Sequence, residues 1–388
     1  MQLKHNILKM YLLKGVLWFM VSMPIIVLFF QSHGLSLTEI MLLQSAYSLS
    51  LALFEIPSGY IADSFGRKNS IVLGTILTFL GYLIFSFYYG FYNFIMAEIL
   101  LGLGGSLISG ADSALIYDTL LETKEKNSYT KIEGKNYAIG NFSEAIAGIL
   151  CGFLVVSSIY LPIYIQTGII FLSIPIGITL VEPKIYTNNR LERSYKSMIK
   201  ISYYTFIKNK KLRWLIIYSS AMGVATLTMA WLTQPFFKEI NVPLKYFGIL
   251  WAGLNILAGL ASIQAHKFDK KYSTNKSMIN ISIFMSILFI SLALNINIYG
   301  FSIIMLVYLL RGVITPILRN LINLNTTSEK RATVLSIRSF TIRFLFAILA
   351  PIIGFLAENY SLSSSFYFVA FFVGLFSIFS SYKLLKLD

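Results

Sequence analysis

The chain alternates between long apolar runs and short polar connections. A helix needs roughly 20 apolar residues to cross a bilayer core about 30 Å thick, because lipid offers no partner for exposed backbone groups. By this criterion the sequence contains twelve candidate spans, near residues 10–31, 38–61, 69–89, 92–117, 133–157, 160–181, 213–237, 244–265, 276–296, 298–323, 332–357 and 362–383. Barrel strands do not fit, since they are about 10 residues long and alternate in polarity. The pattern therefore predicts an all-α membrane protein with twelve transmembrane helices.

The composition agrees with this pattern. Of the 388 residues, 56% are hydrophobic and 13% are charged, whereas a soluble domain has roughly 25% charged residues. The 31 Phe and 24 Tyr also exclude a disordered or low-complexity chain. Cys151 is the single cysteine, and His5, His33 and His266 lie in tails or loops. We therefore expect no disulfide within the chain, no metal site and no cofactor.

The basic residues indicate the orientation of the chain. Its net charge is +15, and nearly all loop Lys and Arg fall in alternate connections, with only Lys238 and Lys245 on the opposite side. By the positive-inside rule both termini are cytoplasmic. The positive charge thus follows from topology, and we expect no nucleic-acid partner. We expect a multi-pass protein of the cytoplasmic (inner) membrane of a bacterium.

One long connection divides the spans into two sets of six. We expect a bundle at residues 1–181, a cytoplasmic linker at 182–212 and a second bundle at 213–388. Within the linker, apolar residues from Tyr195 to Phe206 fall at helical spacing, with lysines on other faces. This favours either a helix lying on the inner leaflet or a solvated basic linker.

A motif follows the second span. Residues 59–68 read GYIADSFGRK, which resembles the GxxxDxxGRK loop of the major facilitator superfamily. The five matching positions are Gly59, Asp63, Gly66, Arg67 and Lys68. Physically, Gly59 lets a neighbouring helix approach, Gly66 permits a tight turn, and Asp63 can pair with Arg67. The resemblance implies that Asp118, at the cytoplasmic end of span 4, partners Arg67, and that these residues form a cytoplasmic gate.

The resemblance implies two six-helix bundles related by an internal repeat and acting by alternating access. A degenerate second copy of the motif lies at residues 262–271, SIQAHKFDKK, where His266 and Asp269 replace the acid and the turn glycine. Two other patterns of the family are not met. Glu98 stands where proton-coupled exporters have an Arg in the fourth helix, and span 5 lacks their Gly-Pro pair. The resemblance therefore does not imply that particular proton relay.

Several charges lie within the spans. A charge near the bilayer centre costs about 2.5–3.5 kcal/mol on insertion scales, so it usually faces a cavity or a partner. The first half contributes four acids and the second half four arginines: Glu55, Glu98, Asp112 and Glu144, then Arg311, Arg319, Arg338 and Arg343. In the functional interpretation an acid takes up a proton, while Arg311 and Arg343, nearest the midplane, hold an anionic group of the solute. Alternatively these charges form ion pairs, including pairs of the acids with Arg67 or Lys14.

Aromatic residues within the spans are candidates for the lining of an amphiphile site. They include Trp18, Tyr47, Trp231 and Tyr308. In a chain with 15% aromatic residues, packing between helices or exposure to lipid is the competing interpretation.

These features predict a secondary transporter and not an enzyme. The sequence contains neither a Walker-type phosphate loop nor the spacing of a catalytic triad. We expect alternating access with proton-coupled efflux of amphiphilic compounds, by a monomer whose partners are a small-molecule substrate, protons and the bilayer. The alternative within transport is a proton-coupled carrier, importing or exporting a defined organic anion such as a metabolite or siderophore. Outside transport, the alternative is a polytopic receptor or scaffold.

Overall fold

The computed structural model describes residues 3, 5–125, 128–183, 204–272, 275–326 and 331–387. Most of the expected linker at 182–212 therefore lies outside the described residues. The side chain of Asp63 also lies outside the description, as do those of residues 266–271 in the second motif copy.

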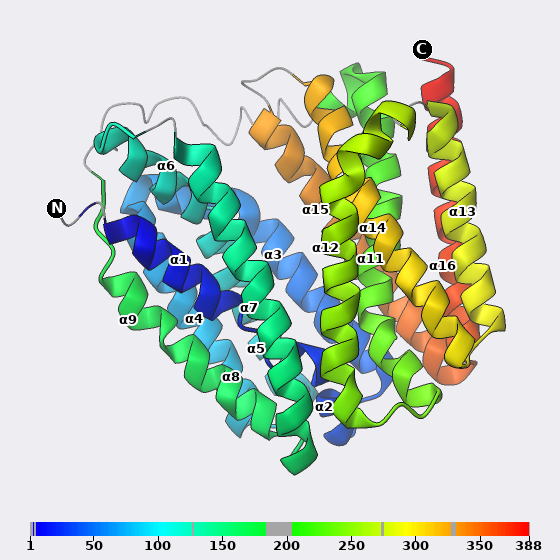
Figure 1. The fold of residues 1–388 in the computed structure, drawn as a ribbon, viewed down its shortest axis with the longest axis horizontal. Helices are drawn as coiled ribbons and strands as arrows, with labels where there is room; N and C mark the ends of the chain where they lie inside the picture. Colours follow the sequence, from blue (N-terminus) through cyan, green and yellow to red (C-terminus); the bar gives the residue numbers. More distant parts are fainter. Residues whose placement is uncertain are drawn as a thin grey trace. The chain divides into compact units, whose positions relative to one another are not determined.

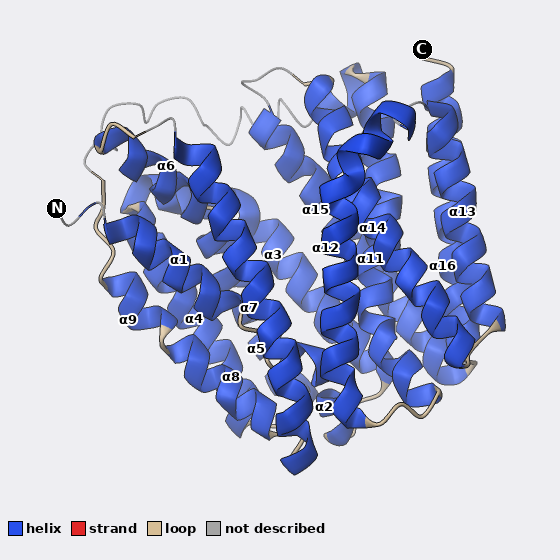
Figure 2. Ribbon diagram, in the orientation of Figure 1, coloured by secondary structure: helices blue, strands red, loops and turns tan. Residues whose placement is uncertain are grey.

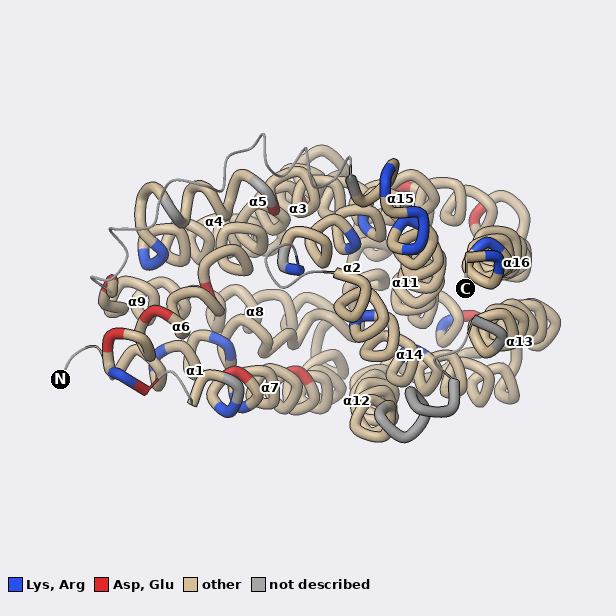
Figure 3. The backbone as a smooth tube through the Cα atoms, turned by 90° about the horizontal axis from the view of Figure 1, so that it is seen from above, with Lys and Arg blue, Asp and Glu red and all other residues tan. Residues whose placement is uncertain are grey.

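The described residues form helices throughout and contain no strand (Figures 1 and 2). Twelve helical stretches are long and apolar enough to cross a membrane, which confirms the number expected from the sequence. The charged positions are few along the otherwise uncharged helices (Figure 3). In chain order the helices are α1 (His5–Trp18), α2 (Ile26–Ser32), α3 (Leu37–Phe65), α4 (Arg67–Phe87), α5 (Phe91–Ser109), α6 (Asp112–Glu122), α7 (Tyr129–Ser157), α8 (Leu161–Phe171), α9 (Ser173–Ile178), α11 (Lys210–Glu239), α12 (Phe247–Tyr272), α13 (Asn275–Leu294), α14 (Ile298–Leu324), α15 (Arg331–Asn359) and α16 (Leu362–Leu385).

The first span is interrupted in its middle. Helix α1 ends at Trp18, and a short 3₁₀ turn, Met23–Ile25, leads into α2. Pro24 explains the interruption, because proline lacks an N–H and its ring clashes with the carbonyl four residues earlier. In the gap, backbone hydrogen bonds join residues only two or three positions apart. For example, Met20 N donates to Trp18 O at 2.9 Å. The sequence pattern predicted one continuous helix here and missed the interruption.

The fourth span is interrupted as well, between Ser109 at the end of α5 and Asp112 at the start of α6. Gly110 lies in this interruption, packed against α3: a Cβ at its position would lie 3.0 Å from Ser58 Oγ. The interruption places Asp112 at the first turn of a new helix, where a carboxylate is stabilised by the free N–H groups.

The chain divides into two compact units. Unit 1 comprises residues 1–35, 46–193 and 244–252, and unit 2 comprises residues 36–45, 194–243 and 253–388. In unit 1, α4 packs closely on α5, and a Cβ added at Gly74 would lie only 2.8 Å from the carbonyl oxygen of Gly104. In unit 2, α16 packs against α13 and α11, and α11 also contacts α15 and α14. The domain boundaries expected from the sequence stay a prediction.

Candidate functional site

The motif loop in unit 1 is held by an ion pair. Helix α3 ends at Phe65, Gly66 adopts φ +100°, and α4 begins at Arg67. The Nε atom of Arg67 lies 2.8 Å from Oδ2 of Asp118, on α6. The two side chains are only 18% and 11% exposed, so this pair is little screened by solvent. The pairing expected between Arg67 and Asp118 is thus present, and it ties the loop to the end of the fourth span.

A second acid, Glu182, binds the same loop and was not predicted. Its two carboxylate oxygens accept hydrogen bonds from the backbone N–H groups of Arg67 and Lys68, at 2.8 and 2.7 Å. It therefore caps the N-terminus of α4, where negative charge is favoured. A Cβ at Gly66 would lie 3.0 Å from Glu182 Oε2. The sequence feature that could have indicated this role is an isolated acid followed by Pro183, directly after the sixth apolar run.

The remaining motif residues are less constrained by the structure. A Cβ at Gly59 would meet no other atom within 4 Å, whereas one at Gly110 would lie 3.3 Å from Gly59 N. The helix approaching this part of α3 is thus the fourth span, and the close contact depends on Gly110. The gate roles of Gly59 and Asp63 stay predictions.

A polar cluster lies where α1, α6 and α7 meet in unit 1. Nζ of Lys14, on α1, is 3.9 Å from Oδ2 of Asp112, and both side chains are less than one-fifth exposed. The other carboxylate oxygen of Asp112, Oδ1, accepts a hydrogen bond from Ser113 N at 2.6 Å. Lys14 also lies 4.6 Å from the ring centre of Trp18, the last residue of α1. Asp112 and Trp18 thus both lie beside Lys14. The sequence suggested proton uptake for Asp112 and the lining of a solute site for Trp18.

Glu133, on α7, completes this cluster. Its Oε1 accepts a hydrogen bond from Ser113 Oγ at 2.7 Å, and its Oε2 is buried without a hydrogen-bond partner in the described structure. The sequence pattern does not distinguish Glu133, because this residue lies at the start of the fifth apolar run between Lys131 and Lys135 and resembles a loop acid. We name Lys14, Asp112, Ser113 and Glu133 the acid–lysine cluster.

Three tyrosines surround the acid–lysine cluster. Tyr11 lies on α1, Tyr117 on α6 and Tyr129 on α7, and the rings of Tyr117 and Tyr129 are 5.3 Å apart. Burial, and then the negative charge of Glu133, raise the pKa of Tyr129 above its ordinary value. Tyr129 therefore stays a neutral hydroxyl at physiological pH, and the charged groups of the cluster are Lys14, Asp112 and Glu133.

The other acids of unit 1 lie elsewhere along the spans. Glu98, on α5, is 5% exposed and interacts electrostatically with Tyr82, which also interacts with Tyr47. Glu55, on α3, and Glu144, on α7, are half-buried. Their roles in proton coupling stay predictions.

A small polar cavity lies inside unit 2. Two arginines line it, Arg311 from α14 and Arg338 from α15. Arg338 is 9% exposed, and its Nε donates a hydrogen bond to Ser219 Oγ on α11. The guanidinium of Arg311 lies 5.7 Å from the ring centre of Tyr308. The remaining lining residues are Met222, Gly223, Thr226, Met285, Ile314, Thr315 and Leu318.

The arginines that line this cavity differ from the pair expected from the sequence, which was Arg311 and Arg343. Arg343 is half-buried and is not among the lining residues, whereas Arg338 lines the cavity together with Arg311. Tyr308 is 1% exposed and packs in the core, and Trp231 is half-buried on α11. The sequence indicated embedded arginines but not which pair would share a cavity, since that depends on how α14 and α15 pack.

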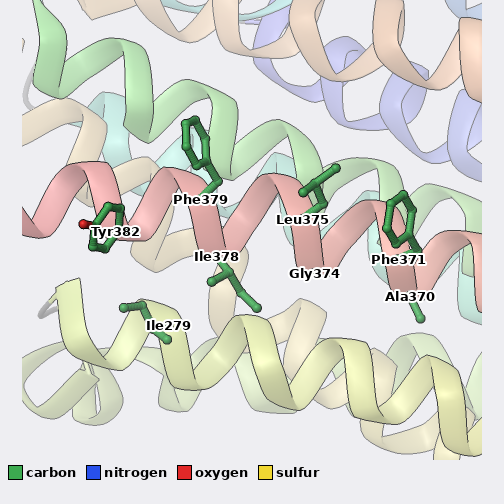
Figure 4. A pocket seen from close by; sticks show the side chains of 8 residues that line it. All are labelled: Ile279, Ala370, Phe371, Gly374, Leu375, Ile378, Phe379 and Tyr382. Carbon is green, nitrogen blue, oxygen red and sulfur yellow. The ribbon is translucent and has the colours of Figure 1, made fainter.

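A larger groove lies between α13 and α16 in unit 2 (Figure 4). Its lining is almost entirely apolar, and Phe371, Leu375 and Tyr382 are each about half exposed or more. Apolar exposed side chains on a membrane-spanning helix are typical of a surface in contact with lipid. This groove offers no polar group that would orient a solute apart from the Tyr382 hydroxyl.

The fold and the loop motif correspond to a known family. The sequence profile of the Major Facilitator Superfamily matches residues 10–323, and the chain belongs to that family.

Relatives of known sequence are distant. The uncharacterized MFS-type transporter YxaM of Bacillus subtilis is 26% identical over 259 residues, which cover 65% of this chain and 63% of YxaM. The quinolone resistance protein NorA of Staphylococcus aureus (strain MRSA252) is 22% identical over 269 residues, which cover 68% of this chain and 66% of NorA. The match thus spans a little under two thirds of each relative.

Solved structures share the fold at low sequence identity. A point mutant of the nucleoside transporter NupG has a TM-score of 0.79 at 14% identity, with 100% of this chain and 98% of that chain covered. The D-xylose-proton symporter has a TM-score of 0.72 at 13% identity, with 98% and 97% covered. The family and its relatives are transporters and not enzymes, as expected from the sequence.

Proposed function

We propose that the protein is a secondary transporter that exports amphiphilic compounds in exchange for protons, by alternating access. Membership of the family supports transport, and the name of the relative NorA, a quinolone resistance protein, supports efflux. The aromatic-rich spans are compatible with an amphiphilic solute. The transporter acts as a monomer in a bacterial inner membrane, with both termini cytoplasmic and with bundles at 1–181 and 213–388.

The observation that carries proton coupling is the acid–lysine cluster. It holds two carboxylates and one ammonium group, and one carboxylate oxygen of Glu133 is buried without a hydrogen-bond partner among the described residues. One lysine neutralises one carboxylate, so the fully ionised cluster keeps a net negative charge within the membrane-spanning part of the chain. Such a charge is costly there, and binding one proton removes it.

Proton binding can then drive a conformational change. In the deprotonated cluster Lys14 is attracted by both acids, whereas in the protonated cluster a single charged pair remains. A proton that binds the two states of the carrier unequally shifts their populations by the difference in binding free energy. About 1.4 kcal/mol changes the population ratio tenfold. The interruptions of spans 1 and 4 lie beside Lys14 and Asp112, so the cluster is placed where these helices can bend.

The test uses purified protein in proteoliposomes with the membrane potential clamped. A fluorescent quinolone, norfloxacin, is first equilibrated, and a pH gradient is then imposed. The proposal expects the gradient to drive accumulation in the wild type, whereas Asp112→Asn and Glu133→Gln exchange solute at equal pH without responding to the gradient. Absence of any protein-dependent flux would favour a receptor or scaffold.

A second candidate is a carrier of a defined organic anion, in either direction. The observation that favours it is the cavity in unit 2 that Arg311 and Arg338 line. Competition for uptake by small carboxylates, with no competition by amphiphilic cations, would favour this candidate over broad efflux.

A further inference from the structure

We propose that Arg311 and Arg338 bind the anionic group, a carboxylate or a phosphate, of the transported solute. The inference rests on the proposed transport function and names the chemistry of its substrate. Its site is the cavity that α11, α13, α14 and α15 form inside unit 2.

The charges in this cavity lack an acidic counterpart. Among the described residues that line it there is no Asp or Glu, and the polar side chains besides the two arginines are hydroxyls: Ser219, Thr226 and Thr315. Both guanidinium groups line the cavity from spans in which a charge is costly, and the positive charge of Arg319 also acts on Arg338. An anion that binds in the cavity offsets these positive charges.

The chemistry of the donors suits a planar or tetrahedral oxyanion. A guanidinium presents several N–H groups in a fixed fork, which matches carboxylate and phosphate oxygens better than the point charge of a lysine. Ser219 fixes Arg338 through its Nε, which leaves the terminal N–H groups of that guanidinium for other partners. The Tyr308 ring lies against Arg311 and restricts its motion.

The size of the cavity limits what it recognises. Its volume is about 20 Å³, which is room for one water molecule or the tip of one polar group. The cavity therefore takes one oxygen of a terminal carboxylate or phosphate and not a whole drug-sized molecule. An amphiphile with one carboxylate or phosphate at its end would satisfy both this site and the aromatic-rich interior of the spans.

Free anions and anionic lipid headgroups share this chemistry, so the experiment must separate them. The protein is placed in nanodiscs of phosphatidylcholine alone, and its thermal stability is measured with benzoate, phenylphosphonate or benzylammonium. These probes share one aromatic ring and differ in charge. The measurement is then repeated in nanodiscs that contain phosphatidylglycerol.

The variants are Arg338→Gln and Arg311→Gln, and the matched control is Arg331→Gln. Arg331 is on α15 like Arg338, but it is exposed and does not line the cavity. We expect benzoate or phenylphosphonate, but not benzylammonium, to stabilise the wild type and the control. We expect the apparent dissociation constant to rise at least tenfold in either cavity variant. Protection by phosphatidylglycerol that abolishes the response to free anions would assign the site to a lipid headgroup and overturn the assignment to the solute.

The inference fails if neither anion stabilises the wild type, or if both cavity variants bind the anions as the control does. That outcome leaves the proposed function standing, provided that the pH gradient still drives norfloxacin flux in the wild type. The converse outcome, anion binding at the cavity without any gradient-driven flux, contradicts proton coupling and leaves the anion site in place.

Discussion

Charged side chains within the spans have different partners in the two units. In unit 1, acids and bases contact each other: Arg67 pairs with Asp118, and Lys14 pairs with Asp112. In unit 2, Arg338 contacts a hydroxyl and Arg311 an aromatic ring, and both line a cavity that has no carboxylate among its described lining residues. Paired charges in a medium of low dielectric hold helices together, whereas charges that face a cavity are available to a ligand. This comparison underlies the proposal that unit 1 provides structure and proton exchange and that unit 2 recognises the solute.

The largest expected effect separates the acid–lysine cluster from the other acids. Asp112→Asn or Glu133→Gln should lower pH-gradient-driven flux at least tenfold, because the cluster then no longer exchanges a proton. Glu125→Gln serves as the control, since Glu125 is an exposed acid just after α6. Glu98→Gln and Glu144→Gln test the sequence-based candidates. A loss of gradient-driven flux only in those two variants would place the proton site at Glu98 or Glu144.

The next effect concerns the ion pair at the motif loop. Asp118→Asn removes a charged partner of Arg67 in a site that is little exposed, and should lower the free energy of unfolding by about 2–4 kcal/mol. Denaturation of the protein in detergent, with Arg67→Gln and the double variant, gives the coupling energy of the pair. A coupling energy near zero would mean that this pair does not stabilise unit 1.

A smaller effect tests the cap that Glu182 provides. Gly66 and Gly90 precede α4 and α5 with nearly the same backbone, φ +100° and ψ 146° against φ +94° and ψ 156°. Alanine at either position should cost about 1–3 kcal/mol from backbone strain.

The two glycines differ in their surroundings. A Cβ at Gly66 would press on the Glu182 carboxylate, whereas one at Gly90 would meet nothing within 4 Å. We therefore expect Gly66→Ala to be the more destabilising in thermal unfolding. Equal losses of stability would show that Glu182 does not cap α4 in solution.

The smallest effect is expected in unit 2. Arg311→Met removes one of two like charges at the cavity, so the free energy of unfolding should change by less than about 0.5 kcal/mol or rise. The same denaturation assay compares it with Asp118→Asn. A loss of stability as large as that of Asp118→Asn would remove the distinction between the two units.

The sequence predicted the fold well, but it indicated only some of the residues that the structure brings together. Run length was enough for twelve helices, because the bilayer sets the length of a span. The motif also indicated the pairing of Arg67 with Asp118. Glu133 and Glu182 were missed because they lie at the ends of apolar runs, where acids are common and only tertiary contacts distinguish them. The interruption at Gly110 was also missed, since membrane helices tolerate glycine.

The gate assigned to the motif also remains to be tested. Asp63→Asn and Gly59→Leu should bias the carrier toward the inward-open state and slow turnover, because the loop network is predicted to favour a closed cytoplasmic side. Distances between spin labels on the cytoplasmic ends of spans 2 and 11 measure this bias. A distribution unchanged in Asp63→Asn would leave the motif a folding signal and not a gate.

The central claim is that the acid–lysine cluster of unit 1 binds one exchangeable proton. Infrared difference spectra of the purified protein, recorded from about pH 5 to about pH 9, test it without knowledge of the solute, since a protonated carboxylic acid has its own C=O stretching band. The account predicts such a band that titrates in the wild type and in Glu125→Gln and that is missing in both Asp112→Asn and Glu133→Gln. A band that titrates unchanged in these two variants would contradict it.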